Sequence, residues 1–84
     1  MSEKQQEIYA VIKEHLEGRG IESGDIKMEA DLAGDLGLDS LDTVELTLAL
    51  EQQYNIEIPD EELTDLASVK DAVELIEKKV SVGT

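Results

Sequence analysis

Residues 35–46 read Asp-Leu-Gly-Leu-Asp-Ser-Leu-Asp-Thr-Val-Glu-Leu and pass from a glycine-containing loop into apolar residues at helical spacing. We therefore predict a helix over 40–54 that begins at Ser40. A serine at a helix start is usually the N-cap itself, but Asp39 directly before it can take that role, with Asp42 three residues further on. Capping by Asp39 would leave the Ser40 hydroxyl free among amide N–H groups that suit a phosphate ester. The two interpretations of Ser40 stay open at this point.

The predicted helix has apolar residues on two opposite sides. One side contains Leu46 and Leu50 and continues into Tyr54, so we expect it to face the core. The other side holds a strip of three apolar residues, Leu41, Val44 and Leu48. Carboxylates border this strip, which favours a surface for docking a partner, although scattered exposed apolar residues are also ordinary.

Two further segments, about 3–17 and 69–80, have helical apolar spacing, and no segment alternates like a strand. Caps are expected from Ser2 with Gln5 and from Ser68 with Asp71. Proline followed by acids predicts a short helical turn near 58–63. The long loop over 18–38 should be pinned by apolar side chains, with a helical turn near 31–34; its pinning residues are Ile21, Ile26, Met28, Leu32 and Leu36.

These elements predict an all-α fold, a small four-helix bundle with three main helices and one short helix. We expect a single domain over 1–84, with an ordered core of about 3–80 and a short C-terminal tail at 81–84. The chain has 84 residues, which suits one thin hydrophobic core.

The charge is strongly uneven along the chain. The net charge is −14, and residues 28–69 hold twelve acids and no lysine or arginine. Nucleic acids and anionic membranes would repel such a chain, so neither is an expected partner. The acidic stretch is interpreted either as a surface for basic partners or as a solvated face that keeps the protein soluble.

Several classes of chemistry are not favoured by the composition. The chain has no cysteine and one histidine, His15, which is expected at the edge of the core and not in a catalytic triad. No specific metal site is expected, although loose binding of divalent cations to the acids is plausible. The N-terminus lacks a secretion signal and no apolar run reaches the roughly 18–20 residues that span a membrane, so we expect a cytoplasmic protein without stable membrane insertion.

The run from Asp35 to Leu46 resembles the acyl carrier protein family, whose hallmark is Asp-Ser-Leu at the start of its second helix. The similarity continues through Ala49-Leu50-Glu51 and through 56–62, which read Ile-Glu-Ile-Pro-Asp-Glu-Glu. It implies that Ser40 accepts 4′-phosphopantetheine from coenzyme A through a separate transferase, and that the arm carries acyl groups as thioesters. The chain would then be a non-catalytic carrier that serves fatty-acid or related polyketide synthesis.

The resemblance also implies two sets of residues. Basic patches of partner enzymes would dock on Asp39, Leu41, Val44, Glu45, Leu48 and Glu51. The acyl chain would be sheltered by Leu46, Leu50, Ile58, Leu66, Ala72 and Leu75. We expect a monomer. The alternatives are an unmodified acidic adaptor or divalent-cation-binding helical module, and a carrier for an acyl group outside fatty-acid synthesis.

Overall fold

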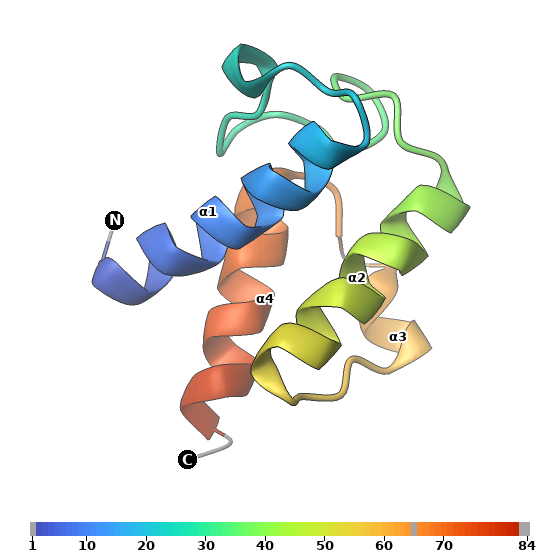
Figure 1. Ribbon diagram of the computed structural model, residues 1–84. Coiled ribbons are helices and arrows are strands. Elements are labelled where there is room, and N and C mark those ends of the chain that lie inside the picture. The colour runs from blue at the N-terminus through green and yellow to red at the C-terminus, as the bar shows by residue number, and fades with distance from the viewer. Residues whose placement is uncertain (1, 65, 83–84) are drawn as a thin grey trace.

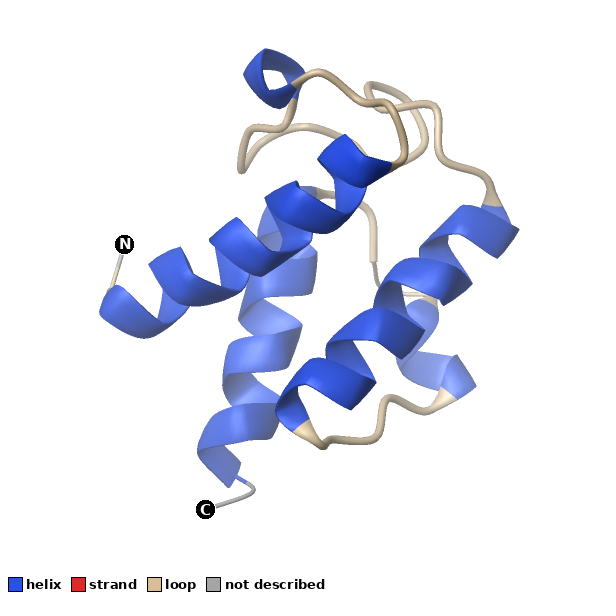
Figure 2. Ribbon diagram, viewed as in Figure 1, coloured by secondary structure: helices blue, strands red, loops and turns tan. Residues whose placement is uncertain are grey.

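The computed structural model describes residues 2–64 and 66–82 and contains helices joined by loops (Figures 1 and 2). The elements are α1 (Glu3–Gly18), a 3₁₀ turn η1 (Ser23–Asp25), α2 (Ser40–Tyr54), α3 (Asp60–Leu63) and α4 (Val69–Val82). α1 packs against both α4 and α2, and the connection between α1 and α2 arches over one end of the bundle (Figure 1). The predicted all-α bundle of three main helices and one short helix is confirmed.

Both ends of α1 follow from local hydrogen bonding. At its start, the Ser2 hydroxyl accepts a hydrogen bond from the Gln5 amide at 3.2 Å. The Gln5 side chain does not return to Ser2 but donates to Glu77 on α4 at 2.9 Å, so only half of the expected capping box forms. At its end, Gly20 has a φ of 97°, a conformation that residues with a Cβ rarely adopt.

α2 and α4 also have caps that the sequence specifies. α2 ends at Tyr54, and the C-cap Asn55 has a left-handed φ of 55° that turns the chain so that the Ile56 amide donates to the Glu51 carbonyl at 3.1 Å. At the start of α4, the Ser68 hydroxyl accepts from the Asp71 amide at 3.2 Å, and the Asp71 carboxylate accepts from the Ser68 amide at 3.1 Å. This reciprocal pair is the predicted capping box.

One hydrophobic core joins the three long helices. Leu46 and Leu50 on α2 are buried, as expected, and so are four residues of α4, Val69, Ala72, Val73 and Ile76. On α1, Ile8, Ile12 and Leu16 are fully buried, whereas Val11 is only half-buried. The helical residues of this core are Ile8, Ile12, Leu16, Leu46, Leu50, Val69, Ala72, Val73 and Ile76.

The long connection before α2 is held against α4 by main-chain hydrogen bonds. The Leu32 amide donates to the Ala67 carbonyl at 2.9 Å, and the Val69 amide donates to the Ala30 carbonyl at 3.0 Å. The Tyr9 hydroxyl of α1 also donates to the Ile26 carbonyl. These hydrogen bonds satisfy backbone groups that would otherwise be buried without a hydrogen-bond partner.

Apolar side chains of this connection reach the core as expected. Ile26 and Leu32 are buried, and Ile21, Met28 and Leu36 pack against the core. The expected turn near 31–34 is present as hydrogen-bonded turns over 32–36, whereas the turn η1 was not expected from the sequence.

α4 runs to Val82, two residues beyond the expected end at 80. The expected tail therefore contributes part of this helix, and residues 83–84 lie outside the described part of the chain. No helix within the described residues is long and apolar enough to cross a bilayer.

Candidate functional site

Ser40 is the first residue of α2 and is exposed to solvent. Its hydroxyl forms no hydrogen bond within residues 2–64 and 66–82. The loop reaches it through Gly37, whose φ of 70° turns the chain just before the helix. The Ser40 side chain is therefore presented at a helix tip where a second molecule can reach it.

Asp39, and not Ser40, caps the helix. The Asp39 carboxylate accepts a hydrogen bond from the Asp42 amide at 2.9 Å, and the Asp42 carboxylate accepts from the Asp39 amide at 3.2 Å. The Thr43 hydroxyl donates to the Asp39 carbonyl at 3.1 Å. This arrangement resolves the open question about Ser40, because the cap is complete without its hydroxyl. The first amides of the helix, including that of Ser40, have no intrahelical partner and point toward the same tip.

A groove of about 420 Å³ lies beside Ser40, lined by the first turns of α2, the loop before it, the end of α3 and the segment that follows α3. Its volume lies within the range of ligand pockets in proteins. Apolar side chains from the loop before α2, from α2, from α3 and from the segment after it contribute to its walls, so the groove is suited to an apolar chain that starts at Ser40. The lining residues are Ala33, Leu38, Asp39, Ser40, Thr43, Val44, Leu63, Thr64 and Leu66.

The residues expected to shelter an acyl chain lie in or against the core. Leu46, Leu50, Ile58 and Ala72 are buried in it, while Leu66 and Leu75 pack against it half-buried. Of these six, only Leu66 lines the groove beside Ser40. The sequence reasoning did not single out Ala33, Leu38 and Leu63 for this surface, because they come from one loop and a short helix without a shared periodicity.

The three apolar residues expected on the outer side of α2 are exposed. Leu41 is 65% exposed, Val44 37% and Leu48 50%. They lie on the same helix as the buried Leu46 and Leu50, so α2 does have one core side and one outer apolar side. We call Leu41, Val44 and Leu48 the outer strip.

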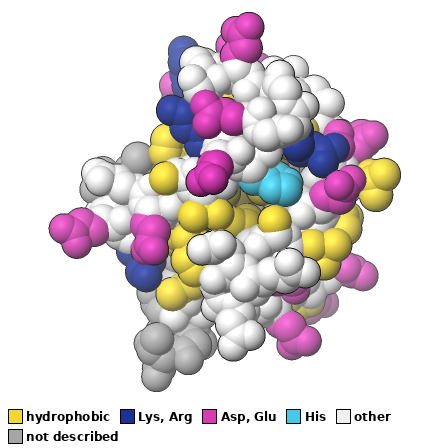
Figure 3. All heavy atoms as spheres, viewed as in Figure 1, with side chains coloured by type: hydrophobic (Ala, Val, Ile, Leu, Met, Phe, Trp, Pro, Cys, Tyr) yellow, Lys and Arg dark blue, Asp and Glu magenta, His cyan; other side chains and the backbone are white. Residues whose placement is uncertain are grey.

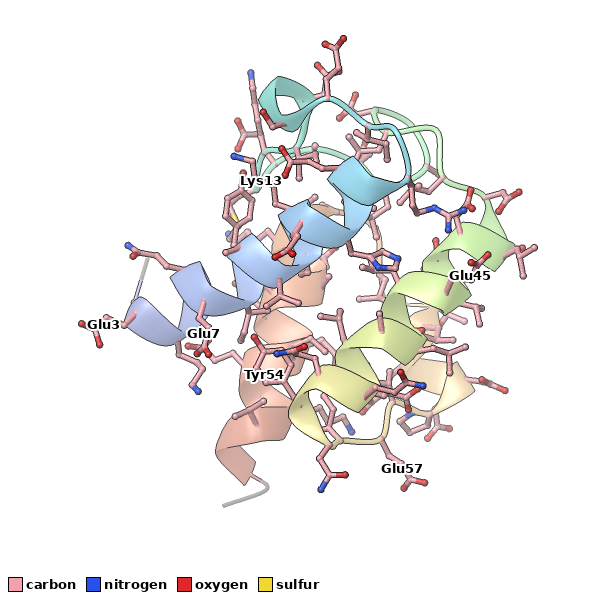
Figure 4. All side chains as sticks on the ribbon, in the orientation of Figure 1. Glu3, Glu7, Lys13, Glu45, Tyr54 and Glu57 are labelled. Carbon is pink, nitrogen blue, oxygen red and sulfur yellow. The ribbon has the colours of Figure 1, made fainter. Side chains whose placement is uncertain are left out.

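The carboxylates expected beside the outer strip are not equivalent. Asp39 and Glu45 are exposed, and Figure 4 shows Glu45 on the half of α2 that is nearer the connection from α1. Glu51 is half-buried, and its carboxylate accepts a hydrogen bond from the Ile58 amide at 2.8 Å. Glu51 therefore holds the connection after α2 in place, a role that its sequence position did not indicate.

Arg19, at the C-cap of α1, reaches this surface and was missed by the sequence reasoning. Its guanidinium pairs with the carboxylates of Asp42 and, at 3.1 Å, Glu45. No sequence signal singled it out, because Lys27, and not Arg19, directly precedes the long stretch without lysine or arginine.

A second hollow, of about 490 Å³, lies between α1 and α2, away from Ser40. Figure 3 shows hydrophobic side chains gathered along the middle of this face, with acidic side chains around them. His15 lines the hollow and is half-buried, as expected for a residue at the edge of the core, and its Nε2 is buried without a hydrogen-bond partner in the described structure.

Tyr54, at the far end of α2, has a buried hydroxyl that also has no partner in the described part of the chain. Burial, and next the negative charge of Glu7 on α1, raise the pKa of Tyr54 above its ordinary value of 10.0. Figure 4 shows the two side chains on facing sides of α1 and α2.

Comparison with known proteins points to one family. The family described as "Phosphopantetheine attachment site" matches residues 10–76. A relative named "Acyl carrier protein" from Prochlorococcus marinus (strain MIT 9515) is 47% identical over 74 residues, which cover 88% of this chain and 89% of the relative. The crystal structure of an acyl carrier protein from Thermotoga maritima has a TM-score of 0.87 and 25% sequence identity, with 100% of this chain and 99% of that chain covered.

Proposed function

Because the chain belongs to the acyl carrier protein family, we propose that Ser40 is the residue that holds its covalent 4′-phosphopantetheine arm. As a member of this family the chain carries acyl groups, and it interacts with a phosphopantetheinyl transferase and with enzymes of fatty-acid synthesis. When attached, the arm supplies the thiol on which acyl groups are held as thioesters. The observation that supports Ser40 is its exposed hydroxyl without a partner, at the tip of a helix that Asp39 already caps.

The surroundings of Ser40 fit such a group. The free amides of the helix start favour the negative charge of a phosphate ester, by about 0.3–1 kcal/mol. The groove that begins at Ser40 offers apolar walls to the rest of the arm or to its cargo. The protein's own contribution is to present the hydroxyl and to orient what is attached to it; we propose that it performs no catalysis.

The attachment residue can be tested by mass. The protein is incubated with coenzyme A, magnesium and a phosphopantetheinyl transferase, and it should gain the mass of one phosphopantetheine. Ser40→Ala should gain none, whereas Ser23→Ala, which alters another exposed serine, should gain the full mass. A Ser40→Ala protein that is still modified would reject Ser40. An unmodified wild-type protein would instead support the acidic adaptor, an alternative that the family match does not favour.

We propose that partner enzymes dock on the outer strip and on the carboxylates beside it. Three exposed apolar residues in register provide a contact area, and Asp39 and Glu45 provide charges that a basic patch can pair with. Glu51 would contribute less than these two, because the Ile58 amide already holds its carboxylate.

Glu45→Lys tests the docking surface. It should weaken binding to the transferase or to a fatty-acid-synthesis enzyme while the helicity measured by circular dichroism is unchanged. Glu74→Lys is the matched control, because it makes the same charge change at an exposed position on α4. Equal affinities for the two variants would contradict docking on α2.

We further propose that an acyl chain enters through the groove and reaches the core between the helices. The groove is the apolar surface that starts at Ser40, and Leu66 connects it to the core. The expected deeper lining belongs to the core or packs against it and consists of Leu46, Leu50, Ile58, Ala72 and Leu75.

The gain in melting temperature on acyl loading measures this sheltering. It should shrink in Leu66→Gln but not in Leu48→Gln, which places the same side chain on the outer strip. Comparing loaded and unloaded forms of each variant cancels its intrinsic stability. A full gain in Leu66→Gln would argue against this route. We also expect a cytoplasmic monomer, which sedimentation and cell fractionation can check.

A further inference from the structure

The acidic segment 28–69 has no cation of its own, so any internal neutralisation must come from outside it. The described structure shows two cations that do this. Lys79 of α4 pairs with Glu62 of α3 at 2.8 Å, far along the chain from Ser40. Arg19 pairs with Asp42 and Glu45, which are the carboxylates of the first turns of α2.

We propose that Arg19 masks the docking surface by acting as an internal competitor for the cations of partner proteins, an inference that rests on the docking surface proposed above. The guanidinium occupies two carboxylates at once, and one of them, Glu45, is a residue that a basic partner is expected to meet. A partner that pairs with Glu45 must displace Arg19 or share the carboxylate with it. The free energy of the internal pairs is therefore subtracted from the free energy of docking.

The exposures of the three side chains support competition over a purely structural role. Glu45 keeps 47% of its side-chain surface exposed, so a partner can approach it while Arg19 is in place. Asp42 is 22% exposed and Arg19 29%, so both lie deeper than Glu45. Asp42 already has a separate role in the cap through the Asp39 amide. The other guanidinium nitrogen, Nη1, pairs with Glu45, whose carboxylate the fold does not need for its own hydrogen bonding.

The position of Arg19 also allows its side chain to move away from Asp42 and Glu45. It follows the end of α1, and its main-chain amide is held by the carbonyl of Leu16 independently of the side chain. The two hydrogen bonds of the α2 cap are made between Asp39 and Asp42 themselves, and Arg19 is not one of the buried core residues. Displacement by a partner arginine or lysine therefore requires only side-chain movement.

The test compares Arg19→Gln with Lys4→Gln in the full-length protein with Ser40 unmodified. Both variants remove one positive charge, and Lys4 also pairs with a carboxylate, Glu7, at 3.4 Å, but on the exposed part of α1. The dissociation constant for a phosphopantetheinyl transferase is measured by calorimetry at low and high salt. At low salt Arg19→Gln should bind about two- to fivefold more tightly than Lys4→Gln, the range expected for releasing a surface ion pair. The gain should fall as salt screens the exposed carboxylate.

Two further variants keep the result interpretable. In a Glu45→Gln background, the gain from Arg19→Gln should largely disappear, because the unmasked charge is absent. Arg19→Lys should give a smaller gain in the same direction, since an ammonium cannot hold two carboxylates with a planar fork; it also serves if Arg19→Gln loses helicity.

The outcomes of these binding measurements distinguish a failure of the proposed masking by Arg19 from a failure of the proposed docking surface. Equal or weaker binding by Arg19→Gln relative to Lys4→Gln overturns the masking. If Glu45→Lys still weakens binding in that experiment, the docking surface stands without it. If Glu45→Lys binds normally, the docking surface itself is wrong and the masking is rejected with it.

Discussion

Replacing Asp39 separates the two roles that this residue has, as a helix cap and as an exposed charge beside Ser40. Its carboxylate accepts the Asp42 amide at 2.9 Å, and this bond is lost in Asp39→Ala. Asp39→Asn removes the same charge but keeps an oxygen that can accept the bond, since asparagine is as good an N-cap as aspartate. Changes in repulsion among the acids and in the helix dipole are therefore common to both variants and cancel in the comparison.

The difference between the variants measures the cap. Loss of a side-chain N-cap costs about 1 kcal/mol, within a range of about 0.5–2. The reciprocal bond from the Asp39 amide to the Asp42 carboxylate uses the main chain and survives in both variants, so we expect the central value and not the upper limit. For a domain of this size about 1 kcal/mol corresponds to about 4–8 °C in melting temperature. Asp39→Ala should thus melt about 4–8 °C below Asp39→Asn.

The assay is thermal and urea denaturation followed by circular dichroism at fixed pH and ionic strength. Equal melting temperatures for the two variants would refute the conclusion that Asp39 caps α2, and Ser40 would again become the candidate cap. Loading by the transferase provides the second measurement. If the charge of Asp39 is what the transferase contacts, both variants should load more slowly than wild type and by a similar factor.

Three further predictions concern stability. Tyr54→Phe removes a hydroxyl that has no partner in the described structure and should not lower the melting temperature. The raised pKa of Tyr54 means that the fold favours the neutral phenol, so the wild type should lose stability relative to this variant as the pH rises above about 10. Parallel pH profiles of stability for the two proteins would contradict this. Millimolar magnesium should raise the melting temperature more than sodium chloride of equal ionic strength, since the net charge is −14, and an equal effect of the two salts would argue against cation binding. Ile76 is only 1% exposed, and Ile76→Ala should lower the free energy of unfolding, measured by urea denaturation, by about 2–5 kcal/mol. Lys78→Ala, at an exposed position of the same helix, should lower it by less than about 0.5 kcal/mol. A loss below about 1 kcal/mol for Ile76→Ala would show that the core is not closed there.

The local elements were predictable from the sequence because their causes are local. α2 begins and ends where its cap residues and apolar spacing indicated, at Ser40 and Tyr54. The same spacing separated Leu46 and Leu50, which are buried, from Leu41 and its neighbours on the outer strip. Helical periodicity and capping act over a few residues, so the order of residue types contains the information they need. The family resemblance, which rested on the same residues, is confirmed by the comparisons.

The tertiary structure alone decided which distant segments meet. The hydrogen bonds of Leu32 and Val69 that fix the long connection on α4 join backbone groups, which have no sequence signature. The lining of the groove, which includes Leu38 and Leu63, depends on where that connection and α3 are placed. Arg19 reaches Glu45 only because α1 and α2 pack together. Each of these features is a contact between segments far apart in the chain, and such contacts are selected by the packing of the whole core and not by neighbouring residues.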